Sequence, residues 1–172
     1  MKTIQASRLC TVLLLLTFAL LLAGCETPYK PASNVPPDKA LVYLYRKYNT
    51  LGSGIKIRVY ANGKPVTELT SGDPFKGNYY PFICPPGEVL FEGKDLQMGD
   101  VAMFNFINRK YPLAQIKVEA GKTYYLRLKW ANFVALTGSK AALIQYDSAI
   151  GAQEITNCVL TKSLEPKNAT AQ

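Results

Sequence analysis

Four cysteines are the reactive side chains that stand out in this sequence, and no histidine is present to activate them. Without histidine, neither a Ser–His–Asp triad nor a Cys–His pair can form. The commonest protein ligand of transition metals is also missing. Gly52-Ser53-Gly54 lacks the lysine and the following helix that a phosphate-binding loop needs. The sequence therefore predicts no catalytic residue, no metal site and no cofactor.

Paired carboxylates are a further route to catalysis, because a glycosidase holds two acids across a cleft. Glu92, Asp95 and Asp100 are close in sequence, but they lie beside turn signals. We interpret them as solvated loop charges. A hydrolase that uses them is the least favoured function.

The N-terminal segment has the composition of an export signal. Lys2 and Arg8 precede an apolar run of about 14 residues, whereas a spanning helix needs about 20 and a secretory signal about 7–15. Leu22-Ala23-Gly24-Cys25 closes this run and resembles the lipobox of bacterial lipoproteins. The resemblance implies cleavage between Gly24 and Cys25, a lipid on the Cys25 thiol and an acyl chain on the new amine. A plain membrane-spanning anchor is the less favoured alternative.

The residue after the lipobox bears on location. In enteric-type bacteria, an aspartate directly after the lipidated cysteine tends to retain a lipoprotein at the inner membrane. Glu26 stands there instead, which favours the outer membrane, with the domain facing the periplasm. The chain has 20 basic and 12 acidic residues, and loss of Lys2 and Arg8 leaves a mature net charge of +6. The basic residues are scattered along the sequence, and export argues against nucleic acid as a partner.

Two cysteines, Cys84 and Cys158, remain after processing and lipidation. In an oxidising compartment they could pair as a disulfide. The alternative is two unpaired thiols, each buried as a small apolar side chain.

Short apolar or alternating stretches separated by glycine, proline and asparagine turns predict strands over most of the chain. Asn62-Gly63 is the strongest hairpin signal. Thr123–Trp130 alternates best, and a short helix is predicted from Asp147 or Ser148 to about Ile155. The other predicted strands are 40–45, 56–60, 65–69, 78–84, 88–91, 115–119, 141–146 and 157–161. Residues 93–113 fit either a strand and loop or a short helix.

This pattern predicts a mainly β fold, an antiparallel Ig-like β-sandwich with at most one or two short helices. We divide the chain into a signal peptide (1–24), the lipidated cysteine with a proline-rich linker (25–39), the sandwich domain (40–162) and a disordered tail (163–172). The linker contains four prolines, which favour an extended tether that holds the domain off the membrane.

Four stretches in this order resemble a bacterial lipoprotein family known as domain of unknown function 2846. They are ALVYLYR at 40–46, VYANGK at 59–64, CPPGE at 84–88 and VEAGKTYYLR at 118–127. The resemblance covers roughly residues 38–162 and implies a small Ig-like or PEGA-like β domain. It implies no activity and no catalytic residues. Residues 96–112 look longer than the family pattern and suggest an insertion.

Aromatic residues suggest a binding surface, because the chain has 11 tyrosines, 7 phenylalanines and 1 tryptophan. Tyr79, Tyr80, Tyr111 and Tyr125 are the candidates for exposed side chains that contact a sugar or a protein. The alternative is ordinary packing within the sheets. The leading hypothesis is a non-enzymatic, lipid-anchored binding or assembly module whose partner is another envelope protein. The second hypothesis is a module that binds peptidoglycan or another polysaccharide.

Overall fold

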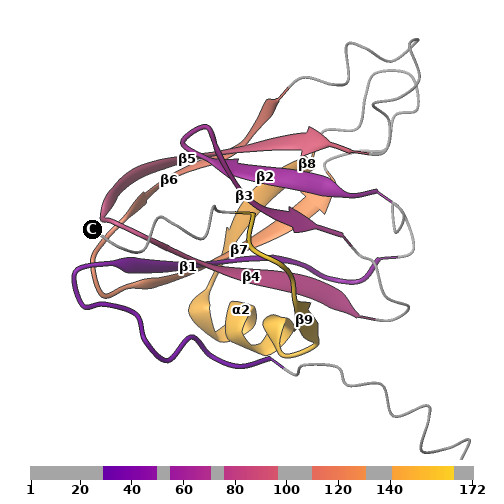
Figure 1. Ribbon diagram of the computed structural model, residues 1–172. Helices are drawn as coiled ribbons and strands as arrows, with labels where there is room; N and C mark the ends of the chain where they lie inside the picture. The colour runs from indigo at the N-terminus through magenta and orange to yellow at the C-terminus, as the bar shows by residue number, and fades with distance from the viewer. Residues whose placement is uncertain (1–28, 50–54, 71–75, 97–109, 131–140, 165–172) are drawn as a thin grey trace, which may run out of the picture.

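The computed structural model describes residues 29–49, 55–70, 76–96, 110–130 and 141–164. These segments contain nine strands and one helix (Figure 1). The strands are β1 (Ala40–Arg46), β2 (Ile57–Ala61), β3 (Lys64–Leu69), β4 (Gly77–Cys84), β5 (Gly87–Asp95), β6 (Tyr111–Val118), β7 (Thr123–Trp130), β8 (Ala141–Tyr146) and β9 (Cys158–Leu160), and the helix is α2 (Ser148–Ile155).

The strands form two sheets that pack face to face, which confirms the predicted mainly β sandwich with a short helix (Figure 1). The four-stranded sheet has the order β3-β2-β5-β6 and is antiparallel throughout. The five-stranded sheet has the order β8-β7-β1-β4-β9. Two of its pairs, β1 with β7 and β4 with β9, are parallel, so this sheet is mixed, which corrects the prediction of a wholly antiparallel sandwich. The C-terminal ends of β1 and β7 therefore lie side by side at the same end of the sheet.

Local sequence signals account for most element boundaries. Asn62 and Gly63 both adopt positive φ, at 48° and 80°, and they join β2 to β3 as the tight hairpin that the dipeptide predicts. Helix α2 begins after Asp147, whose side chain accepts a hydrogen bond from the backbone N–H of Ala149. The uncertain stretch 93–113 begins as the end of β5 and closes as the start of β6. Its middle, with most of the suggested insertion, lies outside the described residues.

One apolar core fills the space between the two sheets. Strands β1 to β8 each contribute side chains to it, and Leu44, Ile57, Phe91 and Leu126 have no exposed surface. The rings of Phe82 and Phe91 meet edge to face with their centroids 5.9 Å apart, which joins β4 to β5 across the sandwich.

A second apolar cluster lies on the outer face of the five-stranded sheet. Its centre is formed by Tyr43, Tyr79 and Tyr125, and we call these three residues with Tyr29 the outer tyrosine cluster. Helix α2 covers one part of this face, and Gly151 allows the helix backbone to lie directly against the ring of Tyr125. In Figure 1, α2 and the indigo N-terminal segment lie on the same side of the sheet, away from β2 and β5.

Residues 29–39 form part of the domain, which corrects the prediction of a free proline-rich tether over 25–39. Tyr29 packs between Tyr43 and Tyr79, with ring centroids 6.0 and 5.3 Å away. The backbone N–H groups of Lys30 and Ala32 donate to the hydroxyls of Tyr79 and Tyr43, over 3.2 and 2.9 Å. Prolines prevent this segment from joining the sheet, but they do not prevent it from packing across the sheet.

The start of the predicted tail is also ordered. The backbone N–H of Leu164 donates to Val66 O over 2.8 Å, and Ser163 forms an isolated bridge with Thr67. The segment after β9 thereby crosses from the five-stranded sheet to β3 at the edge of the other sheet. The domain therefore extends to Leu164, and residues 165–172 lie outside the described residues. Within the described segments, no helix has the length and apolar character needed to cross a membrane.

Candidate functional site

The predicted processing site, Gly24 and Cys25, lies outside the described residues. Lipidation and cleavage therefore stay predictions from the sequence. The described chain begins four residues after Cys25, at Tyr29, which is already packed against the domain.

The predicted tyrosine-rich binding surface is wrong for three of its four residues. Tyr79 is 2 % exposed, Tyr125 is 8 % exposed and Tyr80 is 9 % exposed. Tyr79 and Tyr125 belong to the outer tyrosine cluster, which α2 and residues 29–35 cover, whereas Tyr80 faces the main core. Tyr111 is partly buried, and its hydroxyl donates to a carboxylate oxygen of Asp95 over 2.9 Å. These rings stabilise the fold, as the packing alternative predicted.

The disulfide alternative is also wrong, because Cys84 and Cys158 are both free and buried. Cys158 pairs with Gly77 at one end of β4, and Cys84 lies at the other end. Seven residues of strand separate the two positions by roughly 23 Å, whereas a disulfide needs Cα atoms within about 7 Å. Burial raises the pKa of both thiols, that of Cys158 to about 12, so neither is a reactive thiolate near neutral pH.

The acidic residues near 92–100 do not form a carboxylate pair in the described structure. Asp95 faces inward and is 6 % exposed, whereas Glu92 lies on the opposite face of β5. Asp95 is thus not the solvated loop charge that the sequence suggested. Asp100 lies outside the described residues. Among the described residues, no group of three cysteine or acidic side chains could hold a metal ion.

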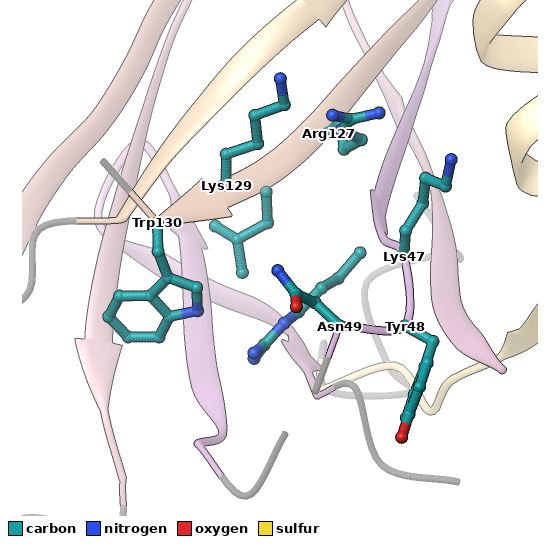
Figure 2. A pocket seen from close by; sticks show the side chains of 8 residues that line it. Lys47, Tyr48, Asn49, Arg127, Lys129 and Trp130 are labelled. Carbon is teal, nitrogen blue, oxygen red and sulfur yellow. The ribbon is translucent and has the colours of Figure 1, made fainter. Parts of the chain in front are cut away.

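A hollow lined by four cationic side chains lies at the ends of β1 and β7. It has a volume of about 280 Å³ and we call it the basic cleft. Figure 2 shows residues from both strands around it, with Lys47 and Lys129 on opposite sides and Trp130 at one wall. The lining residues are Arg46, Lys47, Tyr48, Asn49, Arg127, Leu128, Lys129 and Trp130.

Strand geometry explains how four cations meet at this cleft. The parallel register aligns Tyr45 with Arg127, so the residues that follow on each strand emerge together at one edge of the sheet. On β7, Arg127 and Lys129 point to the outer face, and Leu128 and Trp130 point toward the core. On β1, Arg46 points inward and is 2 % exposed, while Lys47 points outward. The cleft therefore has cations on both sides of the sheet end.

One carboxylate, that of Glu154 on α2, binds two of the outer cations, Arg127 and Lys47. Its Oε1 accepts from Arg127 Nη1 over 2.6 Å and from Lys47 Nζ over 3.0 Å, and its Oε2 accepts from the Tyr45 hydroxyl over 2.9 Å. Burial acts to raise the pKa of Glu154, but these three donors outweigh burial and lower it. Glu154 is therefore ionised at neutral pH and fixes the position of Arg127.

The inner side of the cleft combines a buried guanidinium with an indole. Arg46 Nη1 donates to Ile55 O over 2.6 Å, and its guanidinium carbon lies 5.7 Å from the centre of the Trp130 ring. Burial lowers the pKa of Arg46, and the charge of Asp95 opposes that effect. The Trp130 Nε1–H is buried and has no hydrogen-bond acceptor in the described structure. A cleft with these groups can bind an anion and donate a hydrogen bond to it.

Sequence reasoning missed this cleft because it treated the basic residues as scattered. The alternation of Thr123–Trp130 does place Arg127 and Lys129 on one face, so this pair of cations could be predicted from the sequence. Arg46 and Lys47 lie beside them only because two strands about 80 residues apart pair in parallel. No local pattern encodes that pairing.

Comparisons of this chain with protein-family models, with curated proteins and with solved structures find no match. The resemblance to domain of unknown function 2846 therefore stays a prediction from its four sequence stretches.

Proposed function

We propose that this chain is a lipid-anchored lipoprotein of a bacterial envelope whose β-sandwich is a non-enzymatic glycan-binding module. The anchoring part of the proposal is supported by the signal-like N-terminus and by Leu22-Ala23-Gly24-Cys25. The packing of Tyr29 against the domain adds a geometric consequence. Four residue steps span at most about 14 Å, so a lipid on Cys25 would hold the domain close to the bilayer surface.

The observation that carries the binding part is the basic cleft. A protein partner typically buries about 800 Å² on each side, over a surface with an apolar centre. The cleft is a hollow of about 280 Å³ lined by cations and one indole, which is the scale of a small polar group. The size and lining of the cleft therefore favour the glycan hypothesis. The sequence alone had favoured a protein partner.

Lipid attachment is tested by metabolic labelling with a palmitate analogue. Wild-type protein should carry the label and fractionate with membranes, and Cys25→Ser should lose both properties. Cys10→Ser is the matched control, because it removes a thiol from the apolar run and should keep the label. Label that persists in Cys25→Ser would contradict the anchor.

Glycan binding is tested by sedimentation of the full-length protein, in neutral detergent, with purified cell wall. We expect retention at low salt that decreases as salt rises, because screening weakens contacts between exposed charges. No retention at low salt would contradict glycan binding. Enrichment of one specific protein in crosslinked membranes, without cell-wall retention, would favour the protein-partner hypothesis.

A further inference from the structure

The charges around the basic cleft do not balance. Arg127 and Lys47 share the single carboxylate of Glu154. Lys129 has no ion pair among the described residues, and its ammonium group lies 5.2 Å above the Tyr146 ring. A lysine held over an aromatic face keeps its charge and can still accept an anion on its open side. The outer side of the cleft therefore carries an excess of positive charge.

The indole of Trp130 is the second observation. A buried N–H without an acceptor costs about 1–3 kcal/mol, and native proteins leave few such groups. Figure 2 shows the nitrogen-bearing edge of this ring turned toward Asn49, across the cleft. The ring also offers an apolar face, on which the carbon-bound hydrogens of a sugar pack well. Trp130 therefore provides both a hydrogen-bond donor and a stacking surface.

We infer that the basic cleft binds one acidic sugar unit, a pyranose that carries a carboxylate or a phosphate. Its anionic oxygens lie near Lys129 and Arg127, and an oxygen of the sugar accepts from Trp130 Nε1. The inference deepens the proposed glycan binding by naming the chemical class of the sugar and its site. It does not depend on lipid attachment.

The shape of the cleft favours a sugar over an anionic lipid headgroup. Membrane surfaces attract spread-out exposed lysines, without requiring a hollow or an indole. Here two of the cations are largely shielded, since Arg46 is 2 % exposed and the Arg127 side chain 18 % exposed. The volume of about 280 Å³ lies just below the roughly 300–1,000 Å³ of sites for drug-sized molecules, which suits a single ring.

Trp130 makes the test specific to the site, because it is the only tryptophan in the chain. Full-length protein in neutral detergent is titrated with glucuronate and with glucose 6-phosphate while tryptophan fluorescence is recorded. We expect a saturable change in intensity or wavelength with both acids. Glucose and inorganic phosphate are the controls, and each should bind at least about tenfold more weakly, because each lacks one half of the recognised group.

Charge reversal localises the binding. Lys129→Glu should weaken both acidic sugars by about tenfold or more, since it replaces an attraction by a repulsion. Lys117→Glu is the matched control, because Lys117 is an exposed lysine on β6 of the other sheet. It should bind as the wild type does. Far-UV circular dichroism of both variants verifies that each is folded.

Several results would overturn the inference. They are a flat titration with both acids, equal binding of glucose, equal binding of inorganic phosphate, and equal losses in Lys129→Glu and Lys117→Glu. A response only to micelles that contain phosphatidylglycerol would indicate a lipid headgroup and also overturn it. Cell-wall retention that survives Lys129→Glu would leave glycan binding intact and place it elsewhere, so the two proposals can fail separately.

Discussion

Glu154 joins helix α2 to the basic cleft, and its replacement by glutamine tests how much that link contributes to the stability of the fold. The carboxylate accepts from Arg127 at 2.6 Å, from Tyr45 at 2.9 Å and from Lys47 at 3.0 Å. Glutamine keeps the size of the side chain and removes its charge. The Arg127 guanidinium, 18 % exposed, would then have no carboxylate partner among the described residues.

The expected loss follows from the exposure of the three partners. Hydrogen bonds to charged groups contribute about 1.5–3 kcal/mol each when shielded from water, and exposed ion pairs contribute much less. The Lys47 side chain is 49 % exposed, so its contact adds little. The Arg127 and Tyr45 contacts dominate, and glutamine retains part of the second. We expect Glu154→Gln to lower the free energy of unfolding by about 2 kcal/mol at pH 7.

Glu119→Gln is the matched control, because Glu119 pairs with Lys122 where both side chains are about 60 % exposed. Urea denaturation of each full-length variant, followed by circular dichroism, gives the two differences from wild type. We expect the control to resemble the wild type. Equal effects of Glu154→Gln and Glu119→Gln would refute the argument from burial.

The pH dependence provides a second check with a defined sign. The folded protein holds the pKa of Glu154 below its ordinary value of 4.5. An acid with a lowered folded pKa stabilises the protein above its unfolded pKa, and this contribution is lost as pH falls through the folded pKa. The gap between wild type and Glu154→Gln should therefore be constant near neutrality and shrink below about pH 4.5. A gap that widens on acidification would contradict this sign.

Three further predictions concern groups buried in the domain. Gly151→Ala should destabilise the protein by about 1 kcal/mol or more in urea, because the new methyl group would collide with the ring of Tyr125; a gain in stability, the usual outcome in a free helix, would contradict that contact. Reductant should leave the unfolding midpoint unchanged, and maleimide should modify Cys84 and Cys158 only in denaturant; a lower midpoint on reduction would indicate a bond. Asp95→Ala should cost about 2 kcal/mol by urea denaturation, because it leaves the partly buried Tyr111 hydroxyl without its acceptor and removes a charge that favours the ionised form of Arg46. A loss below about 1 kcal/mol would be inconsistent with that role.

Features encoded within a few neighbouring residues could be predicted from the sequence. The Asn62-Gly63 hairpin, the alternation of Thr123–Trp130 and the helix from Ser148 to Ile155 are confirmed. Each depends on a turn preference, a period of two or a capping residue, and none requires knowledge of a distant strand.

Features that depend on distant segments could not be predicted. Alternation places Tyr79 and Tyr80 on opposite faces of β4, but it does not say that a helix and residues 29–35 cover the outer face. The apolar residues on both faces of β4 can be assigned to two buried faces only once the elements that cover its outer face are known. The burial of Tyr79 and the composition of the basic cleft are therefore tertiary properties.

The central place of β1 has a consequence for the order in which the domain folds. Its neighbours are β4, which begins about 35 residues later, and β7, whose Thr123 pairs with Leu41 about 80 residues away. Until β7 is present, one edge of a wholly buried strand has no partner, and closing so long a loop is slow compared with forming a hairpin. Strand β1 therefore gains its second neighbour only after about three quarters of the chain has been synthesised, and the five-stranded sheet is complete only when β9 (Cys158–Leu160) has followed. A growing chain with this topology exposes an unpaired apolar strand until β7 arrives, and it is prone to aggregation during that interval.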